Sequence, residues 1–116
     1  MPDEIRIKHE HLVTLIAQTL ASVGVPAPTR DIEAELMAEA DLLGVPSHGI
    51  RMLPGLVRGI RDGKANPNPQ IKILRERAAT CLLDVDNGPG RFVSVQAMNH
   101  AIARAKSFGI GACVAM

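Results

Sequence analysis

The sequence predicts an α/β protein, with a helical segment over residues 1–65 and the beginning of a mixed α/β domain over residues 66–116. Two observations support this fold class. In the first segment, apolar residues recur every three or four positions, which is the spacing of amphipathic helices. In the second, a strand-like segment, a helical segment and another strand-like segment follow one another, and this order indicates a βαβ unit.

Two helices are expected before residue 44. The first covers residues 8–23 and ends at Gly24, because glycine commonly follows a helix and the prolines beyond it indicate a break. The second covers residues 30–43, with Thr29 as its N-cap. Asp31 and Glu33 then lie near its positive end. The residues expected to face inward are Leu12, Leu15, Ile16, Leu20 and Val23 in the first helix, and Ile32, Leu36, Met37, Ala40 and Leu43 in the second.

A third helix is expected after the turn GVPSHG, residues 44–49. Its regular part should begin between Arg51 and Pro54, because proline is tolerated only in the first turn of a helix. Its apolar face contains Leu53, Leu56, Val57 and Ile60.

The second half predicts a small sheet with one covering helix. Residues 70–76 alternate apolar and polar side chains like a half-buried strand, whereas residues 80–86 form a more continuous apolar run, typical of a strand covered on both faces. A helix follows over residues 91–108, and residues 109–116 begin another strand. The helix residues expected to face inward are Phe92, Val95, Met98, Ala101, Ile102 and Ala105. A βαβ unit normally belongs to a larger sheet. We therefore expect the amino-terminal part of a longer protein, or a chain that borrows its missing layer from another.

Composition and charge argue against several classes of protein. The formal net charge is +1, so nothing in the overall balance indicates binding to nucleic acid or to an anionic membrane. No apolar run approaches the roughly 20 residues that span a bilayer, and the N-terminus lacks the apolar centre of a signal peptide. Cys81 and Cys113 lie in apolar runs without a CxxC pair or a histidine at metal-ligand spacing. We expect a cytoplasmic protein with no metal site, whose cysteines are small core residues kept reduced.

The turn before the third helix contains the candidate site. The imidazole of His48 is a side chain that can donate or accept a proton, the hydroxyl of Ser47 can hold one ring nitrogen, and Gly49 lets the backbone come close to a bound molecule. Arg51 offers a planar fork suited to a carboxylate. Together they could bind a small acid and protonate an oxygen on it. Alternatively, Ser47 caps the third helix and His48 is an ordinary surface residue, and the spacing alone favours this second interpretation.

Two other motifs suggest binding sites but lack part of the pattern that such sites need. DNGPGRFV, residues 86–93, follows a strand and opens a helix, as the dinucleotide fingerprint GxGxxG does. Val93 nevertheless occupies the third glycine position, and the acidic residue expected about 20 positions later is missing. The third helix is basic, with Arg51, Arg58, Arg61 and Lys64, which invites a helix-turn-helix interpretation. The near-zero net charge and the βαβ unit that follows favour a solvated basic face.

Four segments, in order and in spacing, carry a resemblance to a known family. They are EADLLGVPSHGIRMLP (39–54), RDGKANPNP (61–69), LLDVDNGPG (82–90) and QAMNHAIARAKSFGIG (96–111). They resemble the amino-terminal part of the malate/L-lactate dehydrogenase family, which is unrelated to ordinary lactate dehydrogenase and includes ureidoglycolate, sulfolactate and diketogulonate oxidoreductases. The resemblance implies an NAD(P)-dependent oxidoreductase with a non-Rossmann cofactor fold, incomplete here, that acts as a homodimer on a small 2-hydroxy or 2-oxo acid.

The resemblance also implies roles for the candidate residues. His48 corresponds to the proton donor, Ser47 to the residue that orients it, and Arg51 to an arginine associated with the substrate carboxylate. Leu56 stands where many relatives have an aromatic residue, which leaves the substrate open. Most contacts to NAD or NADP are expected beyond Met116, so the chain is not expected to turn over substrate by itself. The alternative is a non-catalytic helical module for dimerisation or DNA binding, derived from such an enzyme.

Overall fold

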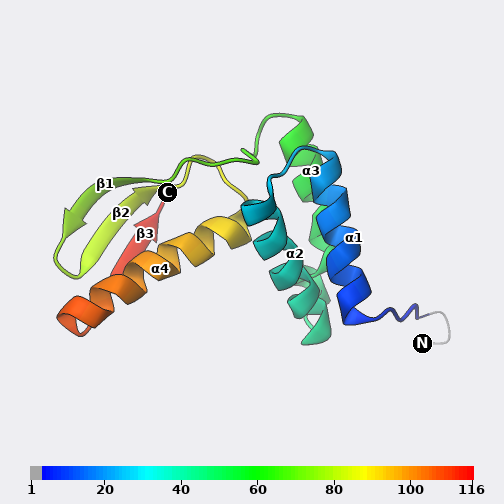
Figure 1. The fold of residues 1–116 in the computed structure, drawn as a ribbon, viewed down its shortest axis with the longest axis horizontal. Helices are drawn as coiled ribbons and strands as arrows, with labels where there is room; N and C mark the ends of the chain where they lie inside the picture. Colours follow the sequence, from blue (N-terminus) through cyan, green and yellow to red (C-terminus); the bar gives the residue numbers. More distant parts are fainter. Residues whose placement is uncertain (1–3) are drawn as a thin grey trace. The chain divides into compact units, whose positions relative to one another are not determined.

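The computed structural model describes residues 4–116, which divide into two compact units. The first unit ends at Asp62 and the second comprises Gly63–Met116 (Figure 1). The first is helical, and the second contains a three-stranded sheet with one long helix.

The first unit is built from α1 (His9–Ser22), α2 (Ala27–Leu42) and α3 (Leu53–Arg61). Helix α1 confirms the prediction, and Gly24 follows it with a positive φ of 85°, a conformation that glycine adopts without strain. Leu15 is an exception to the predicted face, since it is 47% exposed. The core of this unit consists of Leu12, Ile16, Leu20, Val25, Ala34, Met37, Ala38 and Leu53.

Helix α2 corrects two predictions. It begins at Ala27, so Thr29 is a buried residue of its first turn and not the N-cap. The break after α1 is confirmed, but α2 starts earlier than the predicted residue 30, because proline fits the first turn, where the backbone N–H groups have no partner within the helix. The inward face is also rotated: Leu43 is 70% exposed, whereas Glu33 is fully buried. Close packing against α1 selects the small residues Ala34 and Ala38, both fully buried, over larger apolar ones.

The third helix confirms its predicted start. Two short 3₁₀ turns, η1 (Pro46–His48) and η2 (Ile50–Met52), lead from α2 into α3, and Pro54 lies in the first turn of α3. Leu53 is buried. Its predicted companions Leu56, Val57 and Ile60 pack against the core of the first unit.

The second unit contains β1 (Lys72–Arg77), β2 (Thr80–Asp84), α4 (Gly90–Phe108) and β3 (Ala112–Ala115). The strand order is β1-β2-β3, with β1 antiparallel and β3 parallel to β2 (Figure 1). Since α4 connects the two parallel strands, the predicted βαβ unit is confirmed.

The predicted burial of the strands was wrong. Helix α4 packs mainly on β3 and β2, so β2 is covered on one face only: Cys81 and Leu83 are buried and Leu82 between them is half-buried. All of β1 is exposed, because it is an edge strand outside the main contact of α4. Its register also shifts between Ile73 and Arg75, which interrupts the alternation of faces.

The inward face of α4 also differs from the prediction. Val93 and Arg104 are its buried residues, while Met98 is 59% and Ile102 45% exposed. Gly111 explains part of this choice, because a Cβ there would collide with the backbone of α4 at Ala101 and Ala105. The face of α4 that meets the start of β3 is therefore set by close backbone approach and not by the largest apolar side chains. The core of this unit consists of Cys81, Leu83, Val85 and Val93.

Candidate functional site

The turn that carries the candidate residues lies between α2 and α3. Helix α2 ends at Leu42, and Gly44 follows with a φ of 78°, which turns the chain away from the helix axis. Ser47 and His48 lie in η1, and Arg51 lies in η2. All three side chains are exposed.

Ser47 and His48 are in direct contact. The Oγ atom of Ser47 lies 2.9 Å from Nδ1 of His48, which is hydrogen-bond distance. A partner at Nδ1 fixes the orientation of an imidazole and directs its chemistry to Nε2. Ser47 does not cap α3: the N-cap of that helix is Met52, with no side-chain cap hydrogen bond.

Asp41, near the end of α2, contacts the backbone of the turn at Gly49 and Ile50. Its Oδ2 atom accepts a hydrogen bond of 2.7 Å from the backbone N–H of Ile50, and its carboxylate fills the space beside Gly49. A Cβ at Gly49 would collide with that carboxylate. Gly49 is therefore required for an internal contact, which the sequence did not indicate.

The sequence analysis assigned no role to Asp41. The acidic side chain stands eight residues before Gly49, in one of the segments that carry the family resemblance, which is the signal that could have identified it. The hydrogen bond of Asp41 to Ile50 could not be deduced, because the local sequence does not indicate the direction in which η2 leaves the turn.

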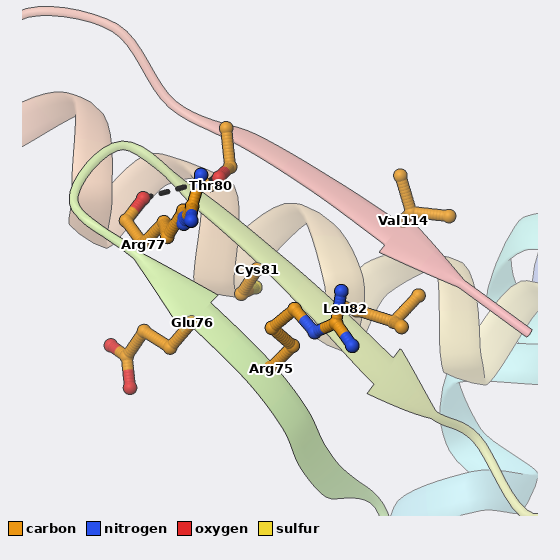
Figure 2. A pocket seen from close by; sticks show the side chains of 7 residues that line it. All are labelled: Arg75, Glu76, Arg77, Thr80, Cys81, Leu82 and Val114. Atoms are coloured by element: carbon orange, nitrogen blue, oxygen red, sulfur yellow. Dashed lines mark hydrogen bonds between the residues drawn. The ribbon is translucent and has the colours of Figure 1, made fainter.

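Two hollows lie elsewhere on the surface, and neither includes residues 44–52. One, of about 550 Å³, lies on the first unit between α1 and α2 and is lined by His9, Glu35 and Glu39 among others. The other, of about 240 Å³, lies on the sheet, where Figure 2 shows Arg75, Leu82 and Val114 around it.

The turn before α4 contains the segment that partly matches the dinucleotide fingerprint. A Cβ at Gly88 would collide with Pro69 and Val93, whereas nothing lies within 4 Å of a Cβ at Gly90. The carboxylate of Asp86 accepts hydrogen bonds from the side chain of Asn66, at 2.8 Å, and from the backbone of Gln70, at 2.9 Å. The side of Gly88 is therefore filled by the chain itself, and the Asp86 carboxylate is occupied by internal hydrogen bonds.

Among residues 4–116, no three side chains of His, Cys, Asp or Glu gather as metal ligands would. No helix in the same range is both long and apolar enough to cross a bilayer.

Comparisons with known proteins agree on one family. A family model described as malate/L-lactate dehydrogenase matches residues 7–116. The chain is 39% identical over 111 residues to a malate dehydrogenase from Pyrococcus horikoshii, covering 96% of this chain and 31% of that protein. It is 40% identical over 105 residues to an L-sulfolactate dehydrogenase from Methanocaldococcus jannaschii, covering 90% of this chain and 30% of the relative. The chain thus spans about a third of the length of these relatives.

The fold of this chain is also similar to that of a solved structure. The solved structure of malate dehydrogenase from Pyrococcus horikoshii superposes with a TM-score of 0.93, at 39% identity, over 96% of this chain and 32% of that one.

Proposed function

The chain belongs to the malate/L-lactate dehydrogenase family, and we propose that it forms the proton-donor part of an enzyme that interconverts a small 2-hydroxy acid and the corresponding 2-oxo acid. Malate and sulfolactate, which name two of its relatives, both carry a hydroxyl group next to a carboxylate. The proposed substrate belongs to this class. The oxidant or reductant is a nicotinamide cofactor, NAD or NADP.

The contact between Ser47 and His48 is the observation that carries the proposal. As a 2-oxo acid is reduced, negative charge builds on its carbonyl oxygen, and a proton must reach that oxygen. His48 as imidazolium is the proposed donor through Nε2, because Nδ1 faces the Ser47 hydroxyl at 2.9 Å. Ser47 is a positioning residue that sets the direction of the ring. In the reverse reaction, neutral His48 takes the proton from the hydroxyl group.

Arg51 is the proposed partner of the substrate carboxylate. Its side chain is exposed in η2, two residues after the glycine that Asp41 supports. A guanidinium can hold a carboxylate through two parallel hydrogen bonds, which fixes the acid in one orientation. That orientation converts a loose encounter into an aligned one, so that the proton donor and the carbonyl oxygen can meet.

The remaining parts of the proposal concern the cofactor-binding residues, the activity of this chain alone and the assembly of the complete enzyme. The turn before α4 has Val93 in place of the third glycine of the dinucleotide fingerprint, so we assign most contacts to NAD or NADP to the part of the family's length that this chain does not span. By the same argument, we propose that residues 1–116 alone do not turn over substrate. The complete enzyme is proposed to be a cytoplasmic homodimer, with residues 1–65 and 66–116 belonging to different domains.

The test is a pair of substitutions in a protein that extends this chain to the length of its relatives. His48→Ala should lower kcat for the 2-oxo acid by about 10²- to 10⁴-fold, the usual contribution of a positioned general acid. Ser47→Ala should lower kcat less and should alter the pH profile, because the ring keeps its chemistry but loses its fixed direction. Lys64→Ala, on an exposed residue outside the turn, is the control. Full turnover in the His48→Ala protein contradicts the assignment.

The non-catalytic alternative is separated by binding assays. Cofactor fluorescence is followed while the extended protein is titrated with NADH and with NADPH. A DNA duplex of random sequence is titrated in parallel at two salt concentrations. Binding of a nicotinamide cofactor supports the proposed function. Salt-dependent binding of DNA, without any response to either cofactor, would favour the helical module instead.

A further inference from the structure

The two cysteines, far apart in the sequence, are neighbours in the sheet. Cys81 on β2 and Cys113 on β3 are direct partners in the parallel register, and their Sγ atoms lie 3.1 Å apart. Neither is part of a disulfide. Adjacent strands lie about 4.8 Å apart, within the range of Cα separations of about 4.4–6.8 Å over which disulfides form. The backbone therefore already holds both residues at a spacing that a disulfide can bridge.

A buried positive charge lies beside the pair. The guanidinium of Arg104 on α4 is ion-paired with Glu76 on β1 at 2.6 Å, and it also donates to the carbonyl of His100 at 3.3 Å. Its side chain is 9% exposed, and its Nε atom has no hydrogen-bond partner. Burial and the neighbouring Cys81 raise the pKa of the Cys113 thiol, and the positive charge of Arg104 offsets only part of that rise. The thiols of Cys81 and Cys113 thus lie near the guanidinium of Arg104, whose Nε atom has no hydrogen-bond partner.

We propose that Cys81 and Cys113 form a reactive dithiol, a modification site at which a small-molecule disulfide of the glutathione class closes a cross-strand bond between β2 and β3. Cys113 is the entry point because it is half-buried, whereas Cys81 is 5% exposed. This site is independent of the proposed dehydrogenase activity, since it involves none of residues 41–51.

The exchange proceeds in two balanced steps. The thiolate of Cys113 attacks one sulfur of the reagent, forms a mixed disulfide and expels one reagent thiolate. Cys81 then loses its proton to solvent and attacks the Cys113 sulfur, which forms the Cys81–Cys113 bond and expels the second reagent thiolate. Two protein thiols are oxidised, and one reagent disulfide is reduced to two thiols. The bond would fasten β3, an edge strand of four residues, to the centre of the sheet.

The environment of the pair sets the pH dependence of the exchange. Burial, followed by the hydrogen bond and charge of Cys81, raises the pKa of Cys113 from 9.0 to about 11, and Arg104 offsets only part of this. The groups facing the pair are Cys81 on β2 and Arg104 on α4, with Glu76 of β1 bound to Arg104. Because the thiolate is the attacking form, the rate should rise about tenfold for each pH unit between neutral pH and about pH 10.

The experiment treats the 116-residue chain with oxidised glutathione and follows its intact mass under native conditions. The expected product has lost two hydrogen atoms, remains a monomer and reverts with dithiothreitol. Cys81→Ser should instead stop at a mixed disulfide on Cys113, and Cys113→Ser should react far more slowly.

Three results would overturn the proposal: a wild-type protein whose product is a stable mixed disulfide, a wild-type protein that forms disulfide-linked dimers, and a wild-type protein that does not react at pH 9 in its folded state. Circular dichroism of each serine variant verifies that it is folded before its reaction is compared.

Discussion

Replacing Gly49 with alanine tests how the turn that carries His48 is held in place. Gly49 is buried, and its backbone φ of −90° lies outside the left-handed region. The added methyl group instead meets the carboxylate of Asp41. That carboxylate must move away, and the backbone N–H of Ile50 then loses its acceptor at 2.7 Å.

The magnitude follows from the bond that is lost. A hydrogen bond to a charged group contributes about 1.5–3 kcal/mol, so Gly49→Ala should lower the free energy of unfolding of the first unit by that amount. In a domain of this size, each kcal/mol shifts Tm by about 4–8 °C. Urea denaturation followed by circular dichroism measures the first quantity, and a thermal melt measures the second.

Gly55→Ala is the matched control. Gly55 lies in α3 with nothing within 4 Å of an added Cβ. Alanine there should raise the stability by about 0.5–1 kcal/mol, because glycine loses more backbone freedom on folding. If Gly49→Ala were as harmless as Gly55→Ala, the proposed packing of Asp41 under the turn would be refuted. A second check is Gly49→Ala in an Asp41→Ala background, where it should cost clearly less because the carboxylate is gone.

Two further predictions concern the second unit. Leu83 is fully buried in the core of this unit, so Leu83→Ala should lower the free energy of unfolding by about 2–5 kcal/mol. Leu82 lies on the open face of β2, so Leu82→Ala should lower it clearly less. Equal losses in urea denaturation would contradict the one-sided covering of the sheet. Cys113 should weaken the fold at alkaline pH. Its pKa is raised from 9.0 to about 11, so the folded state holds its proton where the unfolded state has lost it. The stability contributed by this group is therefore complete below about pH 9 and declines as the pH rises towards 11. Comparing urea midpoints of the wild type and Cys113→Ser across this range isolates the effect, and parallel curves would refute it.

The candidate site was partly predictable from the sequence because the signals that define it are local. Gly44, Pro46 and Gly49 mark a turn whatever the rest of the chain does, and Ser47 and His48 are adjacent in the sequence, so their contact needs no tertiary packing. The support from Asp41 was not predictable. Its bond to Ile50 exists only because the two 3₁₀ turns bring the chain back over the end of α2.

The sequence by itself determined the order of the elements and the βαβ connection, because helix and strand periods, glycines and prolines act over a few residues. Only the tertiary structure decided which faces are buried. Ala34 in α2 and Arg104 in α4 face inward while Leu43 and Met98 are exposed, since close backbone approach and the ion pair of Arg104 with Glu76 outweigh the size of an apolar side chain. The meeting of Cys81 with Cys113 is likewise a product of strand pairing, because register joins residues that no local pattern relates.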